Sequence, residues 1–154
     1  MNAHGMDRHA EPTADREAVL ALNARFYEAL RSMLAGDSSG FGEVFSHSED
    51  VVYLPAEGGV IRGYENAAAD WRRQADASLG GHVDVVSEEV LLQGDVSLIV
   101  TLTRVVLNAP EGPRALNVRE SSVCRREDDQ WRIVAHHADA LGVWDDVVGT
   151  APNP

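Results

Sequence analysis

The sequence contains a single cysteine, Cys124, among 154 residues. One cysteine can form neither an intramolecular disulfide nor a cysteine-based zinc site. Because Cys124 lies in a strand-like run, we expect a buried, inert thiol and not a nucleophile. The glycine-rich motifs of nucleotide-binding proteins are also missing, as are the glycines that flank the nucleophilic serine of many hydrolases. The sequence thus gives no support for disulfide, nucleotide or covalent chemistry.

Basic residues are few: 13 arginines and lysines stand against 25 acidic residues, for a net charge of -12. Such a charge repels nucleic acid phosphates and anionic membrane surfaces. No apolar run approaches the roughly 20 residues that a membrane span requires. The N-terminus lacks the apolar core of a signal peptide. We therefore expect a cytoplasmic protein that binds neither nucleic acid nor membranes.

What the sequence does contain is typical of a soluble globular protein, with 44% hydrophobic and 25% charged residues. A chain of this length suits one domain that is stable without disulfide bonds or a structural metal. Residues 1–12 have no hydrophobic periodicity, and we expect a disordered tail there. A single domain is expected over residues 13–144, followed by a flexible C-terminal tail over residues 145–154.

Helical periodicity dominates the first half of the chain. Apolar residues at spacings of three and four predict an amphipathic helix that begins with Thr13 as N-cap and ends near Gly36. Residues 40–45 suit a short second helix or a turn. The alanine-rich residues 64–77 predict a third helix that Gly80 and Gly81 end.

Strand patterns dominate the second half. Residues 51–54 form a short strand that Pro55 stops, and a hairpin joins it to a strand over residues 60–62. Four longer runs rich in valine, isoleucine and threonine follow, over residues 82–92, 96–108, 115–126 and 130–141. Helices followed by strands with short turns predict an α+β fold, with a curved, mostly antiparallel sheet covered by about three helices. Such a sheet leaves an apolar cavity beneath the helices, where a ligand would bind.

The last run, W-R-I-V-A-H-H-A-D-A-L, carries the sharpest candidate site. Strict strand alternation places His137 and Asp139 on the face that begins with Trp131 and Ile133, and His136 on the opposite face. A carboxyl group among apolar strands loses hydration, which favours proton transfer, so Asp139 is the candidate general acid/base and His137 its partner. The alternatives are a solvated Asp139 at the strand end and a His137 that is merely a satisfied core residue.

Further side chains are candidates for lining the cavity and contacting a substrate: Tyr27, Leu54, Trp71, Thr101, Thr103, Arg119, Ser121 and Trp131. Each has a purely structural alternative, because threonine is a common strand former, aromatic residues usually fill cores and Arg119 suits a solvated face. If Leu54 faces inward, Tyr53 faces away. Because His136 and His137 point to opposite faces, they cannot share a metal ion, and we expect no metal site.

The chain resembles the nuclear transport factor 2-like superfamily over residues 17–141. The resemblance rests on F-Y-E-A-L-R-S-M-L-A-G-D, S-H-S-E-D-V-V-Y-L-P, I-R-G-Y-E-N-A and R-R-E-D-D-Q-W-R-I-V-A-H-H-A-D. This superfamily includes SnoaL-like polyketide cyclases, ketosteroid isomerases and limonene epoxide hydrolases. The resemblance implies a cone-shaped fold whose members share a cavity but not one chemistry.

Within that superfamily the closest functional parallel is the Glu-His-Trp-Asp stretch on the last strand of SnoaL-like cyclases, whose aspartate is the acid/base residue. Here His137 and Asp139 fall on its histidine and aspartate, while His136 replaces the glutamate. Ketosteroid isomerases place their base where this chain has Leu54, and their buried carboxylic acid where it has Ser122 or Arg119, which argues against that reaction. Their helix-borne tyrosine corresponds to Tyr27 or is replaced by Phe26. The Asp-Arg-Asp arrangement of the epoxide hydrolases is not evident.

These features predict a cofactor-free enzyme of cyclase, isomerase or hydratase type that acts on an apolar small molecule. The resemblance suggests a polyketide-like or other secondary metabolite. Outward apolar residues such as Leu102, Val134 and the neighbours of Val100 predict a homodimer through the outer sheet face. A non-catalytic ligand-binding or accessory module and a purely structural dimerisation domain are the alternatives.

Overall fold

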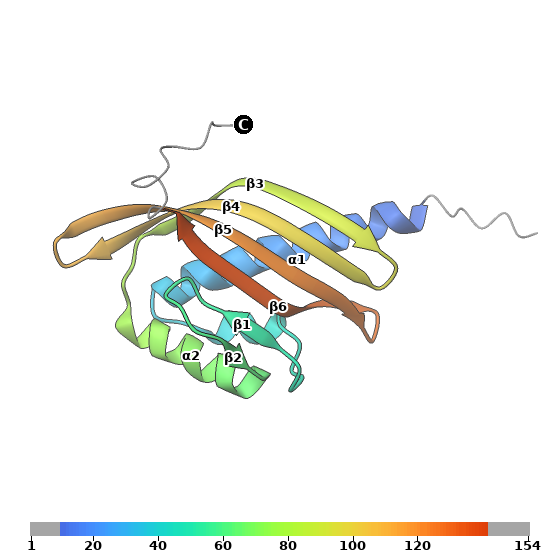
Figure 1. The fold of residues 1–154 in the computed structure, drawn as a ribbon, viewed down its shortest axis with the longest axis horizontal. Coiled ribbons are helices and arrows are strands. Elements are labelled where there is room, and N and C mark those ends of the chain that lie inside the picture. The colour runs from blue at the N-terminus through green and yellow to red at the C-terminus, as the bar shows by residue number, and fades with distance from the viewer. Residues whose placement is uncertain (1–9, 142–154) are drawn as a thin grey trace, which may run out of the picture.

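The computed structural model describes residues 10–141, so the segments 1–9 and 142–154 lie outside the described residues (Figure 1). Its elements follow the predicted order of helices, hairpin, helix and four long strands. In chain order they are α1 (Ala10–Leu34), the 3-10 helix η1 (Ser39–Glu43), β1 (Val52–Leu54), β2 (Ile61–Arg62), α2 (Tyr64–Ala77), β3 (His82–Gln93), β4 (Val96–Ala109), β5 (Gly112–Glu127) and β6 (Gln130–Leu141). The described chain thus has two α-helices, and the expected short helix or turn over residues 40–45 is the 3-10 helix η1.

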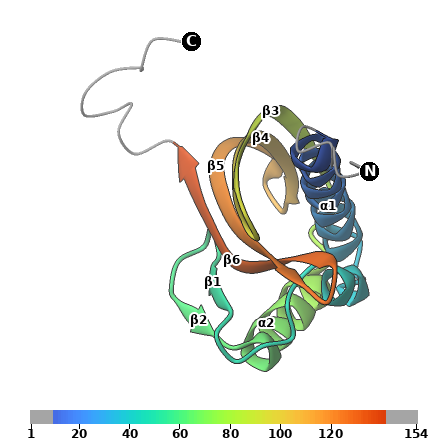
Figure 2. The same cartoon turned by 90° about the vertical axis from the view of Figure 1, so that its right-hand side faces the viewer.

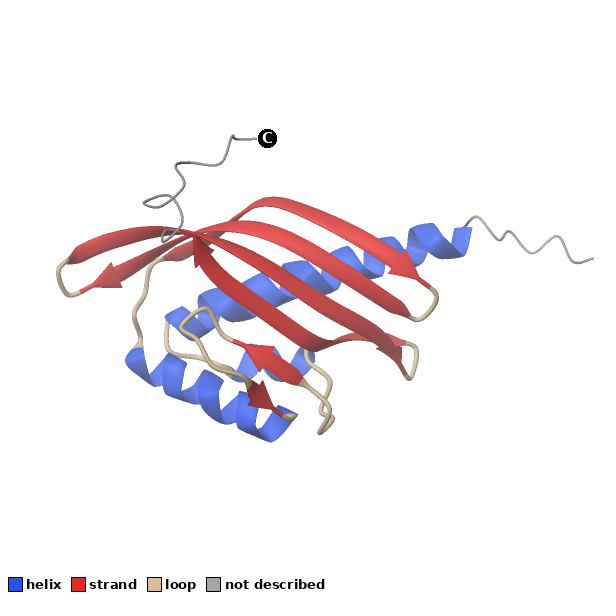
Figure 3. Ribbon diagram, viewed as in Figure 1, coloured by secondary structure: helices blue, strands red, loops and turns tan. Residues whose placement is uncertain are grey.

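The six strands form one sheet in the order β2-β1-β6-β5-β4-β3 (Figures 1 and 3). All neighbouring strands are antiparallel except β1 and β6, which pair in parallel. The predicted hairpin is confirmed, because Val52 pairs with Arg62 and Tyr53 with Ile61. The mostly antiparallel α+β architecture expected from the sequence is therefore present.

Helix α1 packs one apolar stripe against the sheet, with Val19, Leu22, Phe26 and Met33 all buried. It ends where Gly36 adopts a φ of +105°, a left-handed conformation that glycine accepts readily, and donates its backbone N–H to Met33 at 2.9 Å. The helix begins at Ala10, so the expected N-cap at Thr13 is wrong. Neither helix of the described segment is long and apolar enough to cross a membrane.

The sheet curls strongly, and Figure 2 shows its strands as a C-shaped profile whose open side α1 covers, with α2 below β6 and β1. The core between these layers is rich in aromatic rings. Trp71 of α2 stacks on Phe41 with ring centroids 4.7 Å apart, and Phe45 lies 4.6 Å from the same indole. These ring contacts fix α2 against η1 and the segment that follows it.

Tight turns connect the long strands. At the β5–β6 turn, Asp128 and Asp129 have φ angles of +46° and +61°, as the mirror-image turns of hairpins require. Gly81, just before β3, is close to the backbone of β4, since a Cβ there would lie 1.8 Å from the Val106 carbonyl oxygen. Only glycine fits that crossing. The short turns keep the four long strands in register along most of their length.

Candidate functional site

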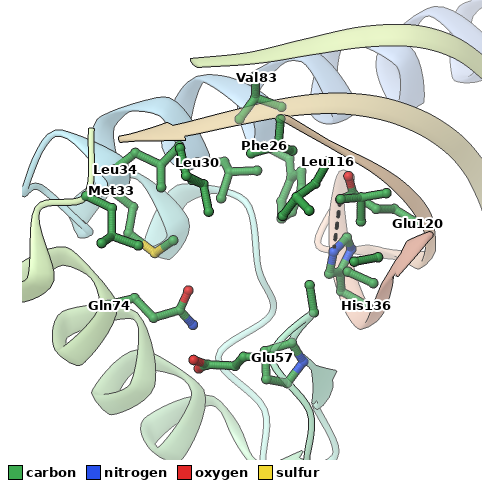
Figure 4. A pocket seen from close by; sticks show the side chains of 18 of the residues that line it. Phe26, Leu30, Met33, Leu34, Glu57, Gln74, Val83, Leu116, Glu120 and His136 are labelled. Atoms are coloured by element: carbon green, nitrogen blue, oxygen red, sulfur yellow. Dashed lines mark ion pairs between the residues drawn. The ribbon is translucent and has the colours of Figure 1, made fainter. Parts of the chain in front are cut away.

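A cavity of about 340 Å³ lies between α1 and the concave face of the sheet (Figure 4). Most of its wall is aliphatic or aromatic, contributed by α1, β3, β4, β5 and β6. The hydrogen-bonding or charged side chains that line it are Tyr53, Glu57, Gln74, Glu120 and His136. The apolar cavity expected from the sequence is therefore present, and it holds few polar groups.

A β-bulge in strand β6 decides which of its side chains face this cavity. Ile133 and Ala135 pair with the consecutive residues Cys124 and Val123 of β5, so Val134 is one extra residue. An extra residue reverses the inward and outward alternation for the rest of the strand. Trp131 and Ile133 are buried before the bulge, whereas His136 and Ala138 are buried after it.

The predicted placement of His137 and Asp139 in the cavity is wrong because of this bulge. Both side chains lie on the outer face, 49% and 66% exposed, although they do bond each other, with His137 Nε2 2.7 Å from Asp139 Oδ2. The expectation that His136 faces outward is wrong for the same reason. His136 lines the cavity and its side chain is only 3% exposed.

His136 meets a buried carboxyl group, Glu120 of β5. The Glu120 Oε2 atom lies 3.3 Å from His136 Nε2, and 4% of the Glu120 side chain is exposed. The other carboxyl oxygen, Oε1, accepts a hydrogen bond from the Thr103 hydroxyl at 2.6 Å. On the far side of the imidazole, Nδ1 lies 2.8 Å from the Ser122 hydroxyl. We call Glu120 and His136 the dyad; Thr103 and Ser122 fix it from either side.

Aromatic residues of α1 complete the surroundings of the dyad. The Phe26 ring lies 4.5 Å from the His136 imidazole, between centroids. Tyr27 interacts with Glu120 and Thr101, and burial, followed by the nearby Glu120 charge, raises the pKa of the Tyr27 phenol. Tyr27 is buried behind the dyad, in contact with Glu120, and is not among the residues that line the cavity. Tyr27 therefore stays protonated and contacts Glu120 as a neutral phenol.

A second group of polar side chains lies across the cavity from the dyad (Figure 4). Gln74 Nε2 donates to Asp70 Oδ2 at 2.7 Å and to the Tyr53 hydroxyl oxygen at 3.4 Å. Burial raises the pKa of Tyr53 to about 12, so its hydroxyl stays protonated at neutral pH. Glu57 lines the cavity too, and its carboxylate forms an ion pair with the exposed guanidinium of Arg73.

The inward residue of β1 is Tyr53, and the expectation that Leu54 faces the cavity is wrong. In the parallel pairing of β1 with β6, Tyr53 lies opposite His136 and Leu54 opposite His137. The bulge that turns His136 inward is thus matched by an inward Tyr53. Tyr53 lines the cavity and Leu54 does not.

Four other expected substrate contacts lie away from the cavity. Trp71 belongs to the aromatic core, and Trp131 is buried under the Arg126 guanidinium, whose Cζ is 4.8 Å from its ring. Arg119 is exposed and Ser121 half-buried, because the buried residues of β5 are those that alternate with them. None of these four side chains lines the cavity, so their expected placement there is wrong.

Thr101 and Thr103 face inward, as expected for cavity hydroxyls, but they lie behind the dyad instead of lining the cavity. Glu120 and Ser122 were not among the predicted site residues, and the expectation that the penultimate strand lacks a buried carboxylic acid is wrong. The sequence pattern that could have indicated them is the strand alternation, which places Glu120 and Ser122 on the same face as the buried Cys124.

Cys124 is buried as expected, and desolvation raises the pKa of its thiol to about 12, which keeps it protonated and unreactive. Over residues 10–141, no three side chains of histidine, cysteine, aspartate or glutamate are grouped so that they could hold a metal ion. The reactive groups at the cavity are thus the dyad and the polar side chains opposite it.

Comparison with known proteins gives both a family and a fold. A family model described as the SnoaL-like domain matches residues 19–140. No curated protein matches the chain. Among solved structures, a candidate dehydratase of the NTF2-like family from Streptomyces avermitilis superposes with a TM-score of 0.76 at 20% identity, covering 86% of this chain and all of that one.

Two similar structures come from a different functional class. A candidate calcium/calmodulin-dependent protein kinase type II association domain from Thiobacillus denitrificans has a TM-score of 0.67 and 25% identity, covering 79% of this chain and 94% of that one. The CaMKII hub from S. rosetta has a TM-score of 0.65 and 20% identity, covering 81% and 95%. The same fold thus serves as a candidate enzyme in one neighbour and as an association domain in others.

Proposed function

The chain belongs to the SnoaL-like domain family, and from this premise we propose that it is an enzyme that performs acid/base chemistry on a small apolar molecule in the cavity, without a cofactor. The observation that carries the proposal is the dyad: a buried Glu120 carboxyl held by His136 and Thr103 at the wall of an apolar cavity. Buried titratable groups that meet in a cavity are typical of catalytic sites.

In this proposal Glu120 is the group that exchanges a proton with the substrate. Its carboxylate removes a proton from a carbon next to a carbonyl group, the C–H bonding electrons pass into the enolate, and Glu120 returns the proton to another carbon or to a leaving hydroxyl. Both ring nitrogens of His136 have partners inside the protein, Glu120 and Ser122. His136 therefore orients the carboxyl group. Isomerisation, cyclisation and dehydration all share this first proton transfer.

The experiment that tests the proposal needs no natural substrate. The protein is incubated in heavy water with the ketone 2-tetralone, a small uncharged molecule with acidic C–H bonds, and deuterium incorporation is followed by proton NMR. The proposal predicts saturable, protein-catalysed exchange above the buffer rate. The resemblance to cyclases favours polyketide-like ketones as natural substrates, which the same assay can rank.

A second candidate function is association without catalysis. The solved neighbours that are association or hub domains support it, together with apolar residues on the outer sheet face. Leu91, Val96 and Val100 are exposed there, at 65%, 51% and 46%. A homodimer through this face would cover them. Light scattering of the protein and of Val100→Glu tests this: the variant is expected to become monomeric.

A further inference from the structure

The charged side chains that line the cavity are acidic, and no arginine of the described residues is among them. The sequence contains no lysine, so all 13 basic residues are arginines. None of those within residues 10–141 lines the cavity, whose only carboxyl-bearing side chains are Glu57 and Glu120. The half-exposed Glu57 forms an ion pair with the exposed Arg73. The polar partners of the buried Glu120 within the described residues are Thr103, His136 and Tyr27.

The dyad has a net positive charge only if both Glu120 and His136 are protonated. With a carboxylate and a neutral imidazole its charge is negative, and with one added proton it is zero whichever group carries that proton. An anion that entered the cavity would therefore lose its hydration without gaining a cationic partner. Burial of an unpaired charge is costly, and a like charge nearby adds to that cost.

The polar groups nevertheless suit a ligand that can form hydrogen bonds at two places. Figure 4 shows Gln74 and Glu57 across the open space from Glu120 and His136. The Tyr53 hydroxyl oxygen accepts from Gln74, which leaves the Tyr53 proton for a ligand acceptor. The wall between these two polar regions is apolar, built from residues such as Phe26, Leu30 and Leu116.

We propose that the cavity selects uncharged molecules: a largely apolar ligand with one oxygen at the dyad and a second hydrogen-bonding group at Tyr53 and Gln74, to the exclusion of carboxylates, phosphates and sulfonates. This inference rests on the proposed function and names the class of substrate that it accepts. Molecules whose anionic group must enter the cavity, such as small carboxylic acids, are thereby excluded as substrates of this site.

The test uses two fluorescent dyes that differ by one sulfonate group. N-phenyl-1-naphthylamine is uncharged, and 1-anilinonaphthalene-8-sulfonate has the same ring system with a negative charge. The uncharged dye is expected to bind saturably and at least about tenfold more tightly than the sulfonate, as a like-charge penalty of that size implies. Glu120→Gln, which replaces the carboxyl group by a neutral amide of the same shape, is expected to narrow this difference to about threefold or less.

Two cavity variants locate the binding site. Leu116→Trp at the half-buried wall and Ala138→Phe beside His136 are both expected to abolish binding of the uncharged dye. Leu102→Phe, which lies on the opposite face of β4 from the buried Thr101 and Thr103, is the matched control and should bind like the wild type. Circular dichroism confirms that each variant used is folded.

Sulfonate fluorescence that survives Leu116→Trp arises outside the cavity and agrees with the inference. The inference is overturned if the sulfonate binds as tightly as the uncharged dye and loses that binding in Leu116→Trp, or if the uncharged dye does not bind at all. Neither result decides the proposed function, because deuterium exchange into 2-tetralone is measured separately and without dye.

Discussion

The carboxyl group of Glu120 and the imidazole of His136 lie 3.3 Å apart, each almost fully buried, on neighbouring strands at the wall of the cavity. They are diagonal neighbours, since His136 pairs with Ser122 and Glu120 with Ala138. Each depends on the other, because a buried carboxyl or imidazole without a partner is costly. Loss of either partner should therefore lower the stability of the fold.

Removal of the imidazole should destabilise the fold. In His136→Ala, Glu120 keeps only its hydroxyl partners, and we expect the free energy of unfolding to fall by about 3 kcal/mol, measured by urea denaturation. The adjacent His137→Ala removes an exposed histidine from an exposed pair and should cost less than about 1 kcal/mol. Adding Glu120→Gln to His136→Ala should recover part of the loss. Equal effects of the two alanine variants would contradict the buried dyad.

Thiol reactivity can show which side chains of β6 face the cavity after the bulge. In Ala138→Cys the new thiol faces inward and should react slowly with a disulfide reagent, whereas in Asp139→Cys it is exposed and should react at the rate of a free thiol. The native Cys124 gives a low background, because burial raises its pKa to about 12. Fast labelling at position 138 with protection at position 139 would show that Asp139 faces inward and Ala138 outward, contrary to the structure.

Stability should decline in alkaline solution because of Tyr53. Burial raises the pKa of Tyr53 to about 12 in the folded protein, and an unfolded tyrosine titrates near 10. The unfolded chain therefore loses this proton first, so the stabilisation is complete below about pH 10 and is lost as the pH rises toward 12. Over that window Tyr53 accounts for about 2–3 kcal/mol.

Urea denaturation at several pH values above about 9.5 checks this expectation. Tyr53→Phe should weaken the alkaline decline, while its pH dependence near neutrality should match that of the wild type. Tyr27, whose pKa is also raised, keeps part of the decline in the variant. An unchanged alkaline slope in Tyr53→Phe would contradict the burial of this hydroxyl.

The sequence predicted the long strands closely, and β6 covers residues 130–141 as expected. Alternating patterns and short polar turns carry that information locally. The bulge at Val134 could not be predicted, because Ile133, Val134 and Ala135 are all apolar and fit either phase of the strand. One undetected residue then reversed the faces of His136, His137 and Asp139.

The expectation that Leu54 faces the cavity was wrong for a related reason, because the orientation of β1 depends on β6. Which of Tyr53 and Leu54 faces inward depends on a parallel pairing with β6 that is not local in sequence. Glu120 was missed for a different reason: both faces of its strand carry polar residues, with Arg119 and Ser121 on one and Glu120 and Ser122 on the other. Burial decides between such faces, and burial depends on the whole fold.

Proton transfer by Glu120 is tested by the rate of deuterium exchange into 2-tetralone in Glu120→Gln. The amide keeps the shape of the side chain but cannot accept the proton, so the catalysed rate should fall about 100-fold or more. Asp139→Asn makes the same change at the exposed carboxyl of β6 and should keep the wild-type rate. A Glu120→Gln protein that exchanges as fast as the wild type, or an Asp139→Asn protein that loses exchange, would show that Glu120 is not the group that transfers the proton.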